Sequence, residues 1–184
     1  MEENNKKIQQ EYSKEILQLE EWSFTKYKEL IFDSNIHNWG EDTSEFGKNI
    51  FEKEKLMFLI EDTENNLFGC YINSKIDKYY YYVKDENAFI FSLRNNGRSN
   101  KMIKMNIKKS SSASAFRLYE NDGNTLFGIG GGHDIEIKKE NSKNKCYCSE
   151  RSFNYPEGKE DILIGKTGYD NKFEVKRIIV IQME

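Results

Sequence analysis

Residues 126–137 read LFGIGGGHDIEI and hold four glycines in five positions: Gly128, Gly130, Gly131 and Gly132. A dinucleotide-binding fingerprint needs Gly-x-Gly-x-x-Gly between a strand and a helix, but here His133 stands at the third glycine position. The residues after the glycines, 133–139, alternate apolar and polar side chains as a strand does. All four glycines are therefore predicted to be structural, in a connection or bulge between two strands where glycine permits positive φ and close backbone approach.

The same alternation predicts which way the side chains after the glycines point. Residues two apart on a strand share a face, so Ile135 and Ile137 are expected to point into a core. His133 lies on their side, and we expect a satisfied, partly buried histidine rather than a metal ligand. Asp134 and Glu136 are expected on the other face, toward solvent.

Short apolar or alternating runs recur along the chain at near-regular spacing, which is typical of strands. They lie at residues 28–34, 55–62, 67–73, 79–83, 88–93, 101–109, 115–119, 125–129, 133–139 and 173–182. Turn residues predict three hairpins, at 63–66, 84–87 and 120–124. A short helix is expected at 46–53 and a polar loop at 140–160. The pattern predicts a mainly β fold with flanking helices, a two-sheet antiparallel β-sandwich.

The first 22 residues have a helical period instead. Ile8, Tyr12, Ile16 and Leu19 recur every three or four residues. Because the segment is too short for a stable coiled coil, we expect a docked or frayed helix, with the remnant of a coiled-coil linker as the alternative. The predicted organisation is an N-terminal helix, 1–21, followed by one domain, 22–184.

Composition narrows the class of protein. The chain has 184 residues, 14% aromatic residues and a net charge of −3, which predicts one folded core and no global basic field for nucleic acid. No apolar run approaches the roughly 18–20 residues that span a bilayer, and the N-terminus has no apolar signal core. Three cysteines make an odd count, which favours a reducing compartment. These features predict a soluble, cytoplasmic protein.

The residues available for catalysis or metal binding are few. Cys146 and Cys148 form a poor zinc pair, and only His37, His133 and Cys70 could add to them. Nucleophilic catalysis needs a base beside the nucleophile, and no spacing demands one. We therefore predict no catalytic residue, no metal and no small-molecule cofactor. The alternative is peroxide-scavenging thiol chemistry at Cys146 and Cys148, which needs accessible thiolates.

Residues 94–117 contain seven basic side chains and no acid: Arg94, Arg98, Lys101, Lys104, Lys108, Lys109 and Arg117. Gathered on one face, they would form a basic patch for an acidic protein, lipid headgroups or nucleic acid. The alternative is a solvated sheet face balanced by acids from elsewhere. The predicted partner-binding residues are Glu86, Arg94, Arg98, Lys101 and Lys104, with a protein favoured over nucleic acid as the partner.

Several segments, in this order, resemble one family. They are ELIFDSNIHNW (29–39), LMFLIEDTENNLFGCYINSKI (56–76), DENAFIFSLRNNG (85–97), LFGIGGGHDIEI (126–137), CYCSERSFNYP (146–156) and KFEVKRIIVIQME (172–184). Together they resemble the TLDc domain of the oxidation-resistance protein family, over residues 22–184. The chain departs from the family pattern at KKENSKNKCYC (138–148), where the family often has a longer acidic and serine-rich segment. We expect only the N-terminal helix, and no membrane-trafficking or peptidoglycan-binding domain, before the TLDc-like part.

The resemblance implies a sandwich of two antiparallel sheets with helices around its rim, in which the glycine cluster is structural. It also implies a role in protection against oxidative stress without an accepted catalytic mechanism. Several members bind the vacuolar proton-pumping ATPase (V-ATPase) and regulate its assembly. The resemblance therefore predicts a non-enzymatic interaction module in the stress response, with V-ATPase subunits as the candidate partner.

Overall fold

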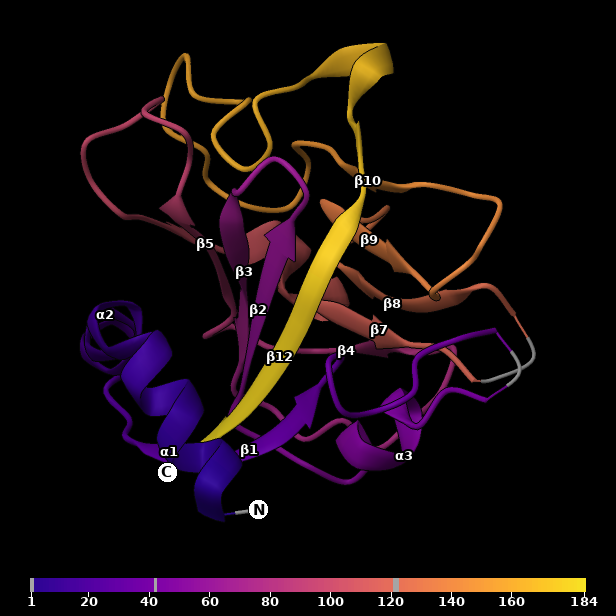
Figure 1. Cartoon of the computed structure of the whole chain (residues 1–184). Helices are drawn as coiled ribbons and strands as arrows, with labels where there is room; N and C mark the ends of the chain where they lie inside the picture. Colours follow the sequence, from indigo (N-terminus) through magenta and orange to yellow (C-terminus); the bar gives the residue numbers. More distant parts are fainter. Residues whose placement is uncertain (1, 42, 121–122) are drawn as a thin grey trace.

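The computed structural model describes residues 2–41, 43–120 and 123–184. Within these ranges the strands form two antiparallel sheets that pack face to face (Figure 1), so the predicted sandwich is confirmed. Met1 of the predicted N-terminal helix, and Asn121 and Asp122 of the predicted 120–124 turn, lie outside the described residues.

The first sheet has the order β1-β12-β2-β3-β5-β6. Its strands are β1 (Tyr27–Asp33), β12 (Val175–Met183), β2 (Leu56–Asp62), β3 (Leu67–Ile72), β5 (Phe89–Arg94) and β6 (Ile103–Asn106). Every residue of β2 and β3 is buried. A sheet covered on both faces needs such continuous apolar strands, which explains runs such as LMFLI.

The second sheet has the order β11-β10-β9-β8-β7-β4. Its strands are β11 (Lys172–Phe173), β10 (Cys146–Cys148), β9 (Ile135–Lys138), β8 (Thr125–Ile129), β7 (Phe116–Leu118) and β4 (Tyr82–Val83). The core between the sheets is rich in aromatic rings, with Phe58, Phe116 and Phe127 in mutual contact. Only one face of this sheet contacts that core.

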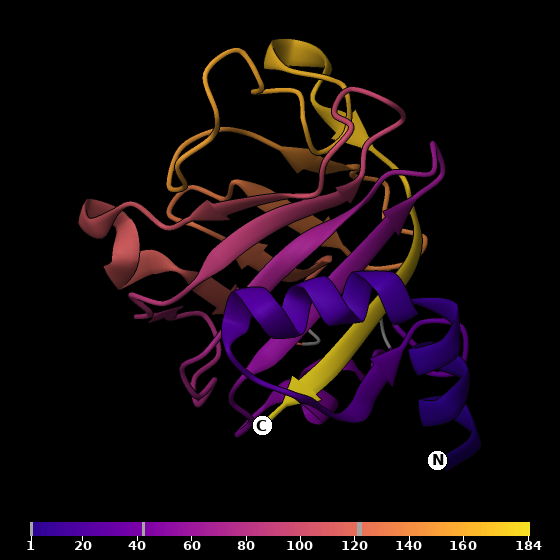
Figure 2. The ribbon, with the colours of Figure 1, turned by 90° about the vertical axis from the view of Figure 1, so that its left-hand side faces the viewer.

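Two N-terminal helices, α1 (Glu2–Glu11) and α2 (Ser13–Ser23), cover the outer face of the first sheet. Figure 2 shows α2 lying across the strands. The four apolar residues of the helical period are all buried, in a second core with the outward side chains of β2, β3, β5 and β12. The docked-helix prediction is thus confirmed, although the helix is interrupted at Tyr12.

A charged cluster attaches α1 to the first sheet. Arg177 on β12 donates to both carboxylate oxygens of Asp33, at 3.0 and 2.7 Å, and to Glu11 on α1 at 2.8 Å. Burial raises the pKa of Asp33, but hydrogen bonds from Arg177 outweigh it and hold the pKa below its ordinary value. The pair is therefore ionised, and each buried charge has its partner.

The remaining helices are short. They are α3 (Phe46–Ile50) and two 3₁₀ helices, η1 (Lys109–Ser114) and η2 (Gly168–Asp170). Phe46 on α3 is buried against Phe32 and Phe127, so this helix closes one end of the sandwich. In the described part of the chain, no helix combines the length and the apolar character needed to cross a membrane.

The second predicted hairpin, across residues 84–87, is wrong. β4 pairs with β7 in the second sheet, whereas β5 pairs with β3 and β6 in the first. Asp85 is buried at this crossing and accepts the backbone N–H groups of Asn73 and Ser74 at 2.6 and 3.0 Å. The turn-like residues therefore fix a crossover between sheets, because Asp85 satisfies backbone donors from another connection.

Two further predictions need correction. Residues 140–160 are not only a polar loop, because they contain strand β10. Residues 173–182 were predicted as one strand, but the chain leaves the second sheet after Phe173 and enters the first at Val175. Apolar and polar residues keep alternating from Phe173 through Glu174 to Val175, so the sequence does not indicate that the chain changes sheet here.

Candidate functional site

One residue from each strand of the second sheet lies in a row across its outer face, which we call the sheet-2 row. Consecutive members are cross-strand partners, and such partners share a face. The row consists of Tyr82, Arg117, Gly128, Glu136, Tyr147 and Lys172. Neither α1 nor α2 covers this face. Glu136 is buried at its centre, Arg117 and Tyr147 are half-buried, and Tyr82 and Lys172 are exposed at its two ends.

Gly128 leaves a gap in the sheet-2 row that His133 fills. A Cβ at position 128 would overlap the His133 ring, so only glycine lets the imidazole lie against β8. Gly128 therefore provides the space in which the His133 ring packs, a role that the sequence pattern did not predict.

The other three glycines form the connection from β8 to β9. Gly130 and Gly132 have φ of 82° and 76°, which favours glycine at both positions. The φ of Gly131 lies outside the positive region, so the second expected reason, close approach, applies to it. A Cβ at Gly131 would lie 3.3 Å from the Cβ of Ser114, at the end of η1. The structure thus places all three in the connection between β8 and β9, two through positive φ and Gly131 through close approach.

His133 is fixed at both ring nitrogens. Its Nδ1 lies 2.6 Å from Glu136 Oε2, and its Nε2 lies 3.2 Å from the Tyr119 hydroxyl. Because an ionised carboxylate only accepts hydrogen bonds, Nδ1 carries the proton and donates to Glu136. In the neutral ring, Nε2 then accepts from Tyr119. The prediction of a satisfied, partly buried histidine is confirmed, since His133 is 9% exposed.

Glu136 is the centre of this network. Besides His133, it accepts a hydrogen bond from the Tyr147 hydroxyl at 3.0 Å and pairs with the Lys138 ammonium group. Burial raises the pKa of Glu136, but hydrogen bonds from His133 and Lys138 outweigh it and lower the pKa to about 2. Burial beside the Glu136 charge also raises the pKa of Tyr147. At neutral pH the network therefore holds a carboxylate among donors.

Contrary to expectation, Asp134 and Glu136 are not exposed to solvent, although Glu136 does lie on the face opposite Ile135 and Ile137. Both are buried, at 0% and 8% exposure, and His133 lies on the side of Glu136 rather than that of Ile135. The physical reason is the φ of 59° at His133, which breaks the alternation of the strand before β9 begins. Parity counted back from Ile135 therefore fails at residues 134 and 133.

Asp134 organises the chain after β10. Its Oδ1 accepts the backbone N–H groups of Arg151 and Ser152, both at 2.9 Å. Burial raises the pKa of Asp134 although these donors act against it. This carboxylate fixes residues 151–152 against the glycine connection, and so places Arg151 beside Gly132.

Arg117 is held by aromatic rings. Its guanidinium carbon lies 5.4 Å from the centroid of the Tyr82 ring and 5.0 Å from that of Tyr119, which is the geometry of cation–π contact. Within the described residues it forms no ion pair, and its Nε is buried without a hydrogen-bond acceptor. Its charge is therefore stabilised by rings rather than by a carboxylate.

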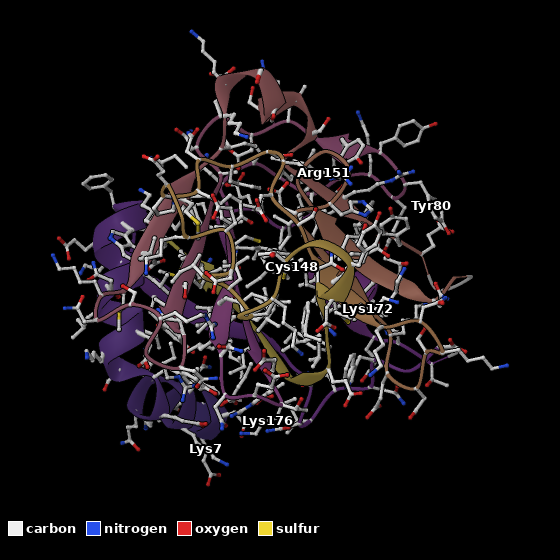
Figure 3. All side chains as sticks on the ribbon, turned by 90° about the horizontal axis from the view of Figure 1, so that it is seen from above. Lys7, Tyr80, Cys148, Arg151, Lys172 and Lys176 are labelled. Atoms are coloured by element: carbon white, nitrogen blue, oxygen red, sulfur yellow. The ribbon has the colours of Figure 1, made fainter. Side chains whose placement is uncertain are left out.

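The cysteines lie inside the protein. Cys146 and Cys148 belong to β10 and point into the core between the sheets, and Figure 3 shows Cys148 near the middle of the molecule. Burial raises the pKa of Cys146 to about 11 and that of Cys148 well above its ordinary value. The thiol alternative requires accessible thiolates; the structure shows buried, protonated thiols instead.

The basic segment 94–117 does not form one patch. Arg117 lies on the second sheet, while Lys104 lies under α2, where its ammonium group donates to the Trp22 carbonyl at 2.8 Å and sits 4.3 Å from the Phe89 ring centroid. Arg94 pairs with Glu61 at 3.2 Å. The segment thus serves two sheets and several separate contacts.

Arg98 connects two loops by hydrogen bonds. Its Nη2 donates to Asn66 Oδ1 at 2.6 Å and to the Leu163 carbonyl at 3.2 Å, which ties the buried residues 162–164 to the β2–β3 turn. Its Nε is buried and has no acceptor within the described residues. Arg98 is therefore engaged in structural hydrogen bonds, and it does not line either of the hollows formed by the other predicted partner-binding residues.

The other four predicted partner-binding residues lie on the two sides of Trp22, near the end of α2. They are Glu86, Arg94, Lys101 and Lys104. On one side, a surface hollow lies between α2 and the chain after β5; we call it the α2 groove. It is lined by Lys14, Gln18 and Trp22 from α2 and by Leu93, Arg94, Lys101 and Met102. On the other side, a second hollow contains Phe24, Glu86 and Lys104. The structure thus brings two predicted residues to each side, and sequence reasoning missed Lys14 and Trp22.

Among the described residues, no group of three or more histidine, cysteine, aspartate or glutamate side chains is arranged to hold a metal ion. The side-chain clusters that stand out are the sheet-2 row with its histidine and the basic α2 groove. They lie on opposite sides of the sandwich, because the groove adjoins the first sheet. Each offers donors and aromatic rings.

The family comparison covers nearly the whole chain. A family model described as TLDc domain matches residues 1–181, so the resemblance predicted from the sequence is confirmed. The matched range includes both N-terminal helices; the predicted division at residue 22 stays a prediction. No curated protein matches the chain.

Proposed function

The chain belongs to the TLDc domain family, and we propose that it acts as a non-enzymatic interaction module in the oxidative-stress response. The proposed partner is the V-ATPase, which several members of the family bind. The α2 groove would receive an acidic segment of a pump subunit. The observation that carries the choice of surface is the charge of that groove.

The groove combines positive charge with an apolar wall. Lys14, Arg94 and Lys101 line it, and no lining side chain is acidic. Arg94 is held in place by Glu61 on β2, whereas Lys14 and Lys101 form no ion pair within the described part of the chain. Opposite charge steers association and fixes register more than it raises affinity. An acidic segment with an apolar anchor against Trp22 therefore fits this surface.

The rings around Trp22 extend the same surface. Phe24 is 93% exposed and has a φ of 56°, so the end of α2 presents an aromatic ring to solvent. Exposed aromatic side chains beside a charged rim are typical of contact surfaces. The predicted residues Glu86 and Lys104 line the hollow at that end, which supports a contact that continues past Trp22.

The proposal is tested by affinity capture from a lysate of the source cell, with V-ATPase subunits quantified by mass spectrometry. The groove variant is Lys14→Glu with Lys101→Glu; Arg98 is left intact because its reversal would disturb the loop that it holds. The matched control, Lys48→Glu with Lys143→Glu, changes the net charge equally at exposed positions elsewhere.

We expect wild type and control to capture pump subunits and the groove variant to lose them. Nuclease treatment should leave the capture unchanged, because nucleic acid does not mediate the contact. Capture by the groove variant at the wild-type level would overturn the assignment of the groove. A wild-type capture without pump subunits would overturn the assignment of the partner.

A further inference from the structure

The outer face of the second sheet presents three hydrogen-bond donors that lack a carboxylate partner; two of them adjoin Gly132, and the third stacks on the Tyr82 ring beside them. They are the guanidinium groups of Arg117 and Arg151 and the hydroxyl group of Tyr82. Among the described residues, neither guanidinium group has a carboxylate within ion-pair distance, and the Tyr82 hydroxyl donates to no acceptor. A half-buried donor such as Arg117 is ordinarily satisfied, and it lies on the same face as the two exposed donors of Tyr82 and Arg151. This concentration of donors points to an anion.

Arg117 is the most constrained of the three. It is the cross-strand partner of Tyr82 on one side and of Gly128 on the other. The rings of Tyr82 and Tyr119 hold its guanidinium group, and its Nε is buried without an acceptor. Leaving a charged donor partly dehydrated and unpaired costs free energy. An anion bound at the terminal nitrogens of the guanidinium group would balance its charge, which no carboxylate within the described residues does, while the Nε–H group stays shielded.

Tyr82 contributes an oriented hydroxyl group. The backbone N–H of Gly132 donates to the Tyr82 oxygen at 3.4 Å, so the hydroxyl proton remains available for another acceptor. Tyr82 is 36% exposed, and its ring lies 6.4 Å from the His133 ring, centroid to centroid. Tyr82 therefore forms both a donor and an aromatic wall at the edge of the row.

Arg151 reaches the same place from the chain after β10. A Cβ at position 132 would lie 2.8 Å from Arg151 Nη1, so the glycine makes room for this guanidinium group. Asp134 fixes the backbone of Arg151 from below. Figure 3 shows Arg151 and Tyr80, the near neighbour of Tyr82 in sequence, toward the same side of the molecule, away from α1 and α2.

The carboxylate behind this face does not cancel its positive charge. Glu136 is already neutralised by Lys138 and hydrogen-bonded by His133 and Tyr147. We propose that Arg117, Arg151 and Tyr82 form a binding site for the phosphate group of a small ligand or a phosphorylated side chain. The oxygen atoms of a phosphate group can accept hydrogen bonds from two guanidinium groups and a hydroxyl group at the same time. A guanidinium group can donate two parallel hydrogen bonds to a phosphate.

This site goes beyond the proposed function, since it lies on the second sheet while the α2 groove adjoins the first. Its test is independent of the V-ATPase. The buried Nε of Arg117 is also a convenient reporter, because an Nε–H group shielded from water exchanges slowly and gives a resolved side-chain signal in ¹H–¹⁵N NMR spectra. Ligand binding at the guanidinium group should shift that signal.

The experiment titrates the full chain with inorganic phosphate, O-phosphoserine and O-phosphotyrosine while the Arg117 Nε–H signal is followed, at constant ionic strength. We expect saturable shifts with wild type and about tenfold weaker binding with Arg117→Lys, which keeps the charge but loses the fork. Arg151→Gln, a substitution at an exposed position, should weaken binding several-fold. Lys48→Gln, at an exposed position outside both proposed surfaces, is the control for the loss of one positive charge and should bind as wild type does.

The three probes distinguish the source of the phosphate. Equal affinities would identify a site for free phosphate, and tighter binding of O-phosphotyrosine would identify a phosphorylated tyrosine that stacks on Tyr82. If Arg117→Lys does not fold, Arg151→Gln and Tyr82→Phe carry the same comparison. Shifts that never saturate, or affinities unchanged in Arg117→Lys and Arg151→Gln, would overturn the site.

Discussion

Replacing Glu136 with glutamine tests whether the buried carboxylate of the sheet-2 row stabilises the fold. Glu136 is 8% exposed and receives hydrogen bonds from His133 and Tyr147 as well as the Lys138 ammonium group. Glutamine has nearly the same shape but no charge. The substitution therefore removes the electrostatic part of these contacts and leaves the packing in place.

The expected magnitude follows from the pKa of Glu136. The carboxyl group has an ordinary pKa of 4.5 and a pKa of about 2 in the folded protein, where hydrogen bonds from His133 and Lys138 outweigh the effect of burial. That difference corresponds to about 3 kcal/mol of stabilisation of the ionised form. We expect Glu136→Gln to lower the free energy of unfolding by about this amount at pH 7.

The assay is urea denaturation of wild type and Glu136→Gln at a series of pH values from 7 to 2. Because the folded pKa lies below the unfolded pKa, the stabilisation is fully present above about pH 4.5 and is lost as the pH falls toward 2. The difference between the two proteins should therefore be constant from pH 7 to 5 and shrink below that. Subtracting the two curves removes the titration of the groups that do not contact Glu136.

The control is Glu174→Gln. Glu174 is exposed and pairs with Lys145 at 2.8 Å, and exposed pairs contribute little. Its substitution should leave the unfolding free energy nearly unchanged at every pH. A Glu136→Gln difference that is the same at pH 7 and pH 3 would refute the reasoning, because the contribution would then come from shape and not from charge.

Three further substitutions test the packing. Gly128→Ala should cost about 1–3 kcal/mol in urea denaturation because its Cβ would displace the His133 ring; Gly123→Ala, which faces open space, should cost far less, and equal costs would contradict the role of Gly128. Cys148→Ser should cost about 1–3 kcal/mol by burying a hydroxyl group without a suitable acceptor, and a thiol reagent should modify Cys148 only after unfolding; rapid modification of the folded protein would disprove its burial. Leu19→Ala should cost about 2–5 kcal/mol, since this side chain is 1% exposed between α2 and the first sheet; a cost below about 1 kcal/mol would show that α2 is not docked.

Local patterns in the sequence predicted most of the strands and the docked helix, because burial imposes a period that is visible residue by residue. Ile8, Tyr12, Ile16 and Leu19 show this well: their spacing alone identifies the face that covers the first sheet. The partner of β4 was not predictable in the same way. Its pairing with β7 depends on Asp85 holding two distant backbone N–H groups, and this contact leaves no periodic signal.

The candidate sites were predictable only in part. Arg117 stood out merely as one of seven basic residues, and Lys14, Tyr82, Tyr119 and Tyr147 were missed. One local signal was available at β10: in Cys-Tyr-Cys, period-two alternation places both thiols inward and Tyr147 outward. The position of His133 had no such signal, because a single positive φ reverses the expected face.

The outer faces of the two sheets are covered differently, and this difference determines where we expect a partner or ligand to bind. The first sheet buries its outer face beneath α1 and α2, so its accessible surface is the edge where α2 ends and the α2 groove begins. The second sheet has no such helical cover within the described residues, and its outer face is buried only around Glu136 and His133, where polar and aromatic side chains hydrogen-bond one another. A network of this kind needs every donor and acceptor matched. Because the matching holds around Glu136 and fails around Arg117, the unmatched end is the part of this face that a ligand would complete.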